Sequence, residues 1–189
     1  MEITINRNYT NLAAKVRECH EMAMDNLKQH FGEKFLNELD AEFNIFAPLN
    51  VTLCGRLKRS LGNAYTFKAN NQNRHRDELK IHRKFYTENN DMECLFDTYS
   101  HELAHILVER LYKGRQNHNW KWSKLHQAMG GNGKQFHNQD VKKYARPYVY
   151  NCGCQKHNIS GKKHNLIQRN GYSYSCRKCR NTIKFEGKL

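Results

Sequence analysis

Five consecutive residues, His101-Glu102-Leu103-Ala104-His105, combine side chains that can bind a metal ion and move protons. Histidines four positions apart lie on one face of a helix, so His101 and His105 can present two imidazole nitrogens to the same ion. Glu102 flanks that ion, where its carboxylate can take a proton from a water on the metal and return it to a leaving amine. The spacing therefore predicts a zinc peptidase site with Glu102 as the general base.

A third protein ligand is needed, because catalytic zinc normally has three protein ligands and one open position. Glu109 lies two helical turns beyond His101 and cannot reach the same ion. His118 stands at the start of the next predicted helix, from where it can face back towards the pair. We predict His118 as the third ligand and keep His126 as the alternative. The buried stripe of that helix is expected to consist of Trp122, Leu125 and Met129. The remaining histidines that we interpret as surface or locally bonded side chains are His20, His30, His75, His82 and His137.

Four of the seven cysteines form two close pairs in one short region. Cys176 and Cys179 have the spacing of a zinc knuckle, and they need a partner pair. Cys152 and Cys154 are separated by one residue, whereas Cys154 and His157 have the usual two-residue gap. We prefer a structural zinc bound by the four cysteines, with His157 as the alternate ligand. The protein is thus expected to hold two zinc ions, one catalytic and one structural.

The positive charge is concentrated at one end of the chain. Residues 141–189 hold 12 Lys and Arg side chains against the single acid Glu186, a net charge of +11, whereas residues 1–140 hold 20 against 17, a net charge of +3. Such a stretch can keep a protein soluble or bind a protein partner, but it also suits phosphate contacts. Aromatic residues lie among these cations and could stack on unpaired bases, which favours single-stranded or frayed DNA as the partner. They are Tyr144, Tyr148, Tyr150, Tyr172, Tyr174 and Phe185.

The periodicity of apolar residues predicts which elements hold these groups. Helices are expected over residues 10–46, 91–113 and 119–129, the second capped by Asn90 or Asp91. Short strands are expected over residues 51–53, 64–67 and 79–81, as a small antiparallel sheet. The region after residue 141 shows little helical periodicity. The chain is therefore predicted to be α+β, with residues 1–140 as the catalytic domain and residues 141–189 as a basic zinc ribbon.

The N-terminal residues contain no apolar segment of the kind that directs export, and the longest aliphatic run is only Ile106-Leu107-Val108. We therefore expect a soluble cytoplasmic protein without a membrane partner, associated with DNA and nuclear if the source is eukaryotic.

The run from His101 to Val108, followed by His118-Asn119-Trp120-Lys121-Trp122, resembles the SprT-like metalloproteases, relatives of the Spartan proteases. In that family a third histidine precedes an aromatic residue by four positions, as His118 precedes Trp122, and a basic zinc ribbon with paired cysteines follows. The resemblance covers about residues 90–189. It implies a zincin-like domain and a zinc-dependent endopeptidase that cleaves proteins bound or crosslinked to DNA. It also implies His101, His105 and His118 as zinc ligands and Glu102 as the general base.

Two other functions fit the same residues. The chain could be a nucleic-acid-binding zinc-ribbon protein in which the histidine motif is inactive, or a peptidase that does not depend on DNA.

Overall fold

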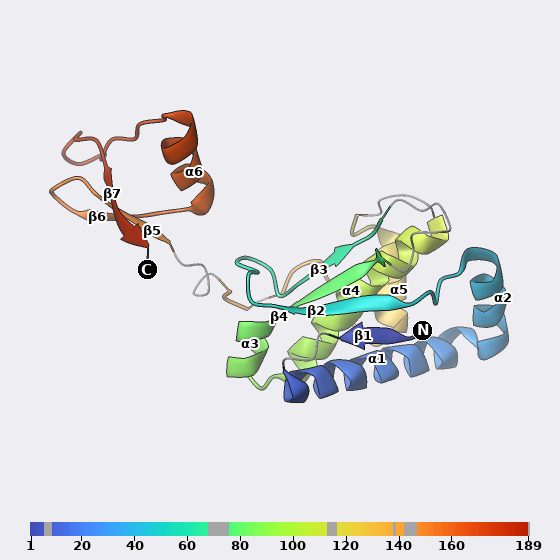
Figure 1. Cartoon of the computed structure of the whole chain (residues 1–189). Helices are drawn as coiled ribbons and strands as arrows, with labels where there is room; N and C mark the ends of the chain where they lie inside the picture. The colour runs from blue at the N-terminus through green and yellow to red at the C-terminus, as the bar shows by residue number, and fades with distance from the viewer. Residues whose placement is uncertain (6–8, 68–75, 113–116, 138, 142–146, 189) are drawn as a thin grey trace. The chain divides into compact units, whose positions relative to one another are not determined.

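The computed structural model describes residues 1–5, 9–67, 76–112, 117–137, 139–141 and 147–188. The chain divides into two compact units, Met1–Val141 and Lys142–Leu189, here called unit 1 and unit 2 (Figure 1). Unit 1 carries the histidine motif and unit 2 carries the paired cysteines. His75 and Tyr144, which the sequence singled out, lie outside the described residues.

Unit 1 combines a sheet with five helices in its described part. In chain order its elements are β1 (Ile3–Ile5), α1 (Thr10–Phe31), α2 (Glu33–Phe43), β2 (Leu49–Cys54), β3 (Gly62–Tyr65), β4 (Glu78–His82), α3 (Arg83–Glu88), α4 (Met92–Tyr112) and α5 (Trp120–Ala128).

The sheet of unit 1 has the strand order β1-β2-β4-β3. β2 pairs in parallel with β1 and with β4, and only β3 and β4 are antiparallel. Among the three predicted strands, the antiparallel pairing is therefore confirmed for β3 and β4 and wrong for β2 and β4, and β1 was not predicted. α1 and α2 form a crossover between β1 and β2, which is the connection that parallel strands need. β4 then inserts between β2 and β3, so two reversals of the chain bring it parallel to β2.

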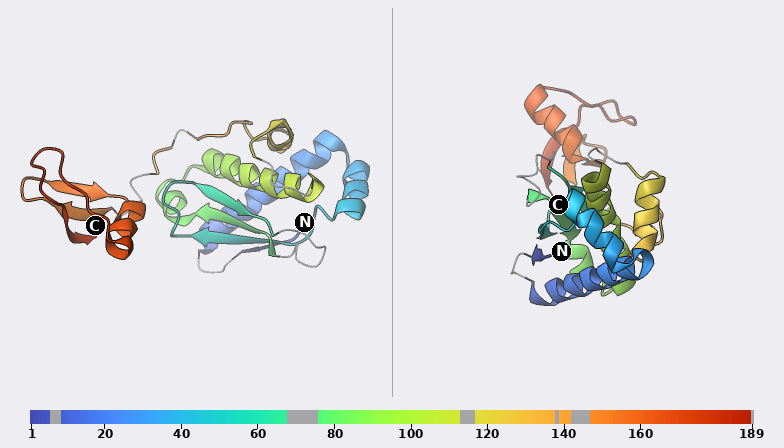
Figure 2. Two further views of the ribbon diagram at one scale, coloured as in Figure 1. Left: turned by 90° about the horizontal axis from the view of Figure 1, so that it is seen from above. Right: turned by 90° about the vertical axis from the view of Figure 1, so that its right-hand side faces the viewer.

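α4 is the buried centre of unit 1. Figure 2 shows the sheet, α4 and α5 as successive layers, and α1 also packs on α4. Asp91 begins the helix as one of the two predicted caps, because its Oδ1 accepts a hydrogen bond from the backbone N–H of Cys94 at 2.9 Å. The observed bounds lie within one residue of the predicted ones. The expected helix over residues 10–46 is instead two helices, α1 and α2, which are separated at Gly32.

A buried ion pair holds the C-terminal end of α4. Nε of Arg110 lies 2.8 Å from Oδ2 of Asp77, and both side chains are at most 3% exposed. Nη1 of Arg110 also donates to the backbone carbonyls of Ile45 and Ala47, at 2.9 and 3.0 Å. The charge is therefore buried with its hydrogen bonds satisfied, as a low-dielectric interior requires. This network ties α4 to the segments that precede β2 and β4.

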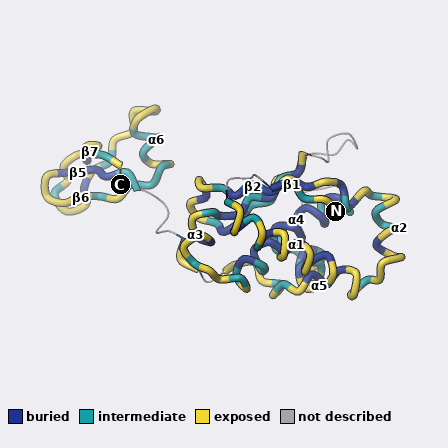
Figure 3. Tube along the Cα trace, turned by 60° about the horizontal axis from the view of Figure 1, so that its bottom comes forward, coloured by how far each residue is buried: buried dark blue, intermediate teal, exposed yellow. Residues whose placement is uncertain are grey.

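Unit 2 contains a three-stranded antiparallel sheet with the order β6-β5-β7. Its elements are β5 (Tyr148–Asn151), β6 (Lys156–Ile159), α6 (Gly161–Asn170) and β7 (Lys184–Lys188). Its core is small and consists of Tyr150, Cys152, Cys176 and Ile183, and Figure 3 shows most of the unit as exposed or half-buried.

The helix α6 contradicts the expectation of little helical structure after residue 141. Its sequence lacks a strong apolar stripe, and none of its residues is buried. The sequence nevertheless contains residues that typically begin and end a helix. Ser160 caps its start by accepting a hydrogen bond from the N–H of Lys163, and Gly171 follows its end in the left-handed conformation.

Candidate functional site

Three histidines meet at one point between α4 and α5. Nε2 of His118 lies 2.9 Å from Nε2 of His101 and 3.1 Å from Nε2 of His105. One nitrogen from each ring falls in a group whose members all lie within 4.8 Å of one another. Nitrogens bound to one tetrahedral zinc at the usual distance are separated by about 3.3 Å. The three predicted ligands are thus brought together, whereas His126 is not part of the group.

Local sequence explains why His118 faces the other two. Asn119 caps α5, since its Oδ1 accepts hydrogen bonds from the N–H groups of Lys121 and Trp122 at 3.1 Å each. The indole Nε1 of Trp122 in turn donates to the backbone carbonyl of His101 at 3.1 Å. The first turn of α5 is therefore fixed against α4, and His118 directly precedes the cap.

The environment favours the neutral form of His101 and His118, which is the form that binds a metal. Burial lowers the pKa of His101 to about 3, and repulsion from the neighbouring His105 adds to the shift. Burial also lowers the pKa of His118. Three imidazole ligands leave the fourth position of a tetrahedral ion open, so the donor set fits a catalytic zinc.

Glu102 lies beside this centre and is only 9% exposed. Burial raises the pKa of its carboxyl to about 8, although a hydrogen bond with the backbone of Ala64 partly opposes the shift. A carboxyl with such a pKa can both accept and release a proton near neutral pH. A carboxyl that can carry a proton therefore belongs to the residue directly after the candidate ligand His101.

The edge strand β3 covers Glu102 so closely that only glycine fits at the point of contact. A Cβ added to Gly62 would lie 2.7 Å from Cγ of Glu102 and 2.9 Å from Cγ2 of Thr98. Sequence reasoning placed residues 64–67 in a strand but did not link that strand to the site. Gly62 lies outside the predicted strand, and nothing local marks it as a contact residue.

His126 has a different role from the one that we kept as an alternative. It is fully buried, and its Nε2 lies 3.3 Å from Oδ1 of Asp97, one turn before His101 on α4. Burial opposes ionisation of Asp97, but hydrogen bonds with His126 and with the backbone of Asn132 outweigh burial and lower its pKa. The buried stripe of α5 therefore contains His126, whereas the predicted Leu125 is half-buried.

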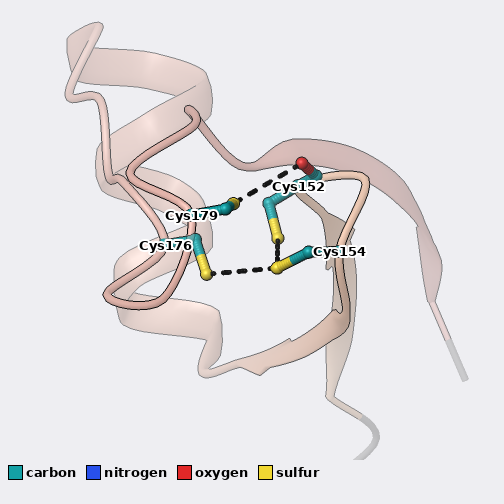
Figure 4. A group of neighbouring side chains, drawn as sticks. All are labelled: Cys152, Cys154, Cys176 and Cys179. Carbon is teal, nitrogen blue, oxygen red and sulfur yellow. Dashed lines mark hydrogen bonds between the residues drawn. The ribbon is translucent and has the colours of Figure 1, made fainter.

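The second centre lies in the turns of unit 2. Sγ atoms of Cys152, Cys154, Cys176 and Cys179 all lie within 4.8 Å of one another. Figure 4 shows the pair Cys152 and Cys154 opposite the pair Cys176 and Cys179. The sulfurs of Cys154 and Cys176 are 3.7 Å apart. Sulfurs bound to one tetrahedral zinc are separated by about 3.8 Å. The four thiols thus fit a structural zinc.

His157, the alternate ligand, lies next to this group without belonging to it. Its Nε2 is 3.2 Å from Sγ of Cys152, and this hydrogen bond is the main cause of the raised pKa of His157. Burial opposes ionisation of Cys152, but hydrogen bonds with His157 and Cys154 outweigh burial and lower the pKa of the thiol to about 5. The pKa of Cys176 is lowered too, whereas hydrogen bonds with Cys152 and Cys179 raise the pKa of Cys154. Cys152 and Cys176 therefore favour the thiolate, the form that binds zinc.

The structure distinguishes the aromatic residues of unit 2 that pack in its core from those that are exposed. Tyr148 stacks on the ring of His164 with 3.6 Å between centroids, and the hydroxyl of Tyr150 lies 3.0 Å from Nδ1 of His164. These two tyrosines serve the unit's own core. Tyr172 and Phe185 are 56% and 47% exposed and remain accessible.

Two histidines interpreted as surface or locally bonded are buried. Nδ1 of His20 lies 2.9 Å from the hydroxyl of Tyr99, and its Nε2 donates to the carbonyl of Met1. His82 is fully buried and accepts a local hydrogen bond from the N–H of Phe85. His20 was misread because its partner on α4 is 79 residues away in the sequence.

Within the described ranges, no helix combines the length and the apolar character needed to cross a bilayer.

Comparisons with known proteins agree on one family. The chain is 30% identical over 109 residues to protein SprT of Glaesserella parasuis, an alignment that covers 57% of this chain and 69% of that protein. It is 32% identical over 123 residues to protein SprT of Pseudomonas paraeruginosa, covering 61% and 73%, and 33% identical over 113 residues to protein SprT of Serratia proteamaculans, covering 57% and 64%. No protein-family model matches the chain, and no solved structure matches it significantly. The resemblance seen in the sequence is confirmed, and the chain belongs to the SprT family.

Proposed function

We propose that this protein is a zincin-like, zinc-dependent endopeptidase in which Glu102 is the general base. The observation that carries the proposal is the meeting of three imidazole nitrogens from His101, His105 and His118 beside a buried carboxyl. A site with three protein ligands and an open position is the usual design of catalytic zinc, whereas structural zinc is closed by four.

Zinc held by the three histidines would polarise the scissile carbonyl and acidify the attacking water. The side chains do the remaining work. Glu102 accepts the proton of the water as the C–O bond forms, and it delivers that proton to the amine nitrogen as the C–N bond breaks. Burial raises the pKa of the carboxyl, whereas the charge of a bound zinc would lower it, so both protonation states that the two steps need would be accessible.

The strand β3 gives a substrate chain a place to lie. It is the last strand in the sheet order, so among the described strands only β4 pairs with it. An extended peptide can pair with such an edge through its backbone. Because Gly62 of β3 touches Glu102, a peptide on this edge would pass close to the proton carrier.

We further propose that the substrates are proteins bound or crosslinked to DNA. Residues 141–189 carry a net charge of +11, and exposed Arg177 and Lys178 project from the turn between two of the cysteines. Exposed Tyr172 adds a ring that could stack on an unpaired base. Unit 2 would thereby hold the peptidase near its substrate on single-stranded or frayed DNA.

The deciding experiment is Glu102→Gln in the full-length protein, assayed on a DNA-bound protein with and without single-stranded DNA. Loss of the carboxylate should lower cleavage by about 10²- to 10⁴-fold, while zinc content and thermal unfolding stay the same. Glu93→Gln, at an exposed position two turns before His101 on the same helix, is the matched control and should cleave like the wild type. Full activity of the Glu102→Gln variant would refute the proposed mechanism, and equal cleavage with and without DNA would refute the proposed substrate.

A further inference from the structure

Unit 1 has a hollow that the proposed peptidase site does not use. It encloses about 320 Å³ and is lined by fifteen residues from α1, α2, α4, α5 and the segment after α2. Figure 1 shows α2 at the same end of the unit as the C-terminal ends of α1 and α4. On α4 the lining residues Leu107 and Leu111 follow the ligand His105, so the hollow and the histidines share a helix.

Large apolar side chains at the rim are exposed. Trp120 is 63% exposed, Phe35 is 47% exposed and Tyr112 is 46% exposed, and all three line the hollow. Leaving such rings in water costs free energy that burial against a partner would recover. Trp and Tyr are also the residues that contribute most binding energy at protein interfaces.

The charged residues that line the hollow have a single sign. Lys121 and Lys124 line the hollow, and none of the described lining residues is acidic. Nζ of Lys121 lies 3.7 Å from the ring centre of Tyr112, and Nζ of Lys124 lies 5.2 Å from that of Trp120. Cations held over aromatic rings present their charge beside an apolar surface. The complementary ligand therefore has an apolar face bordered by carboxylates.

We propose that this hollow is a docking site for an acidic amphipathic helix of a partner protein. A helix in a groove inserts apolar anchors from one face, and flanking glutamates can pair with Lys121 and Lys124. A volume of about 320 Å³ is at the small end of ligand sites and suits a few anchoring side chains.

Trp120 supplies a direct readout. It is exposed at the rim, whereas the second tryptophan, Trp122, is 1% exposed and shielded. The probe is a synthetic helical peptide with leucine and phenylalanine on one face and glutamates along its border. Titration into the full-length protein should produce a saturable blue shift of the emission, which Trp120→Phe removes. Replacing the glutamates of the peptide by lysines should weaken binding by about tenfold or more.

Variants of the protein locate the site. Phe35→Glu should weaken binding by about tenfold or more, and Phe136→Glu, a matched change at a ring 77% exposed elsewhere, should leave binding unchanged. A Lys121→Glu, Lys124→Glu double variant should reverse the preference and bind the lysine peptide better. Phe35→Glu should still cleave protein, and Glu102→Gln should still bind the peptide, so failure of the docking site and failure of the peptidase are distinguishable.

Three outcomes would overturn the proposal. The first is equal affinity for the glutamate and lysine peptides. The second is a shift produced by a free fatty acid such as laurate but not by the peptide, which would make the hollow a lipid site. The third is a dimer in sedimentation that Phe35→Glu dissociates, which would identify a second copy of this chain as the occupant.

Discussion

The indole nitrogen of Trp122 donates a hydrogen bond to the backbone carbonyl of His101 at 3.1 Å. The same ring stacks on that of His105, with 5.5 Å between centroids and 28° between planes. One side chain of α5 therefore contacts both histidines of α4, and it stands four residues after the third histidine, His118. This contact gives a physical reason for the spacing of a histidine and an aromatic residue in the sequence.

Trp122→Phe should keep the stacked ring but lose the N–H donor. Groups that orient metal ligands typically contribute 10- to 100-fold to affinity or activity, so zinc affinity of the histidine centre should fall by about tenfold. Competition with a chelator measures the change. Gln127→Ala, on the exposed side of α5, is the control. Unchanged zinc affinity in the Trp122→Phe variant would show that the hydrogen bond does not position the site.

Gly62→Ala tests the contact between β3 and Glu102. The added Cβ would lie 2.7 Å from Cγ of Glu102, so either the strand or the carboxyl must move. A displacement of about 1 Å at a reacting group can lower turnover by about 100-fold. We expect that loss with zinc retained, measured by cleavage and by metal analysis. Gly187→Ala, where a Cβ meets nothing within 4 Å, should have no effect. Wild-type turnover in Gly62→Ala would contradict the geometry.

The parts of the site that were predicted from sequence are those whose signal is local. The spacing of His101 and His105, the cap of α4 and the paired cysteines each occupy a few consecutive residues. The contacts that complete the site are not local, because Gly62 meets Glu102 across 40 positions. The parallel pairing of β2 was missed for the same reason, since strand direction follows from connections rather than from composition. α6 was not predicted because its sequence signals are the capping residues at its two ends, and its apolar pattern is weak.

Breaking the buried ion pair of Arg110 and Asp77 should destabilise the fold, because the remaining charge would be buried without a partner. Asp77→Asn removes one charge and leaves the other buried at 2% exposure, which typically costs about 3–5 kcal/mol. Urea unfolding of unit 1 measures the difference. Lys80→Met breaks the more exposed pair with Glu78 and should cost less than about 1 kcal/mol. A cost for Asp77→Asn as small as that of Lys80→Met would mean that water reaches Arg110.

His20 should make the stability of unit 1 depend on pH. Burial lowers its pKa below the ordinary 6.5, the amino group of Met1 lowers it further, and a hydrogen bond with Met1 and the charge of Glu21 oppose the shift. Unfolding therefore takes up a proton below pH 6.5, so stability is full above that pH and is lost as the pH falls towards the folded pKa.

The variant His20→Gln should remove this dependence. The slope of unfolding free energy against pH between 6.5 and 5 should decrease by up to about 1.4 kcal/mol per pH unit, the value for one proton. Exposed His30 is the site of the control variant, His30→Gln, which should keep the wild-type slope. Zinc loss at low pH affects all three proteins and cancels in the comparison. Identical slopes in the wild type and His20→Gln would show that His20 titrates normally in the folded state.

The salt dependence of DNA binding tests whether unit 2 contacts the phosphates of nucleic acid. Arg177 and Lys178 are exposed in the turn between Cys176 and Cys179, where they can reach phosphates without disturbing the thiols. Each phosphate contact on a single strand contributes about 0.7 to the slope of log affinity against log salt. Replacing both residues by glutamine should therefore reduce the slope by about 1.4, measured by fluorescence anisotropy with labelled single-stranded DNA.

The matched control for this measurement changes two exposed lysines of unit 1, Lys28 and Lys34, to glutamine. It removes the same net charge from the protein but should leave the slope as it is, because counterions are released only where phosphates are contacted. If both double variants reduce the slope equally, DNA responds to total charge and unit 2 has no particular part in binding. If only the change at Arg177 and Lys178 reduces it, the turn that holds the cysteines also contacts DNA. A structural zinc there would then order the phosphate-binding side chains, and zinc removal from unit 2 should weaken DNA binding together with its fold.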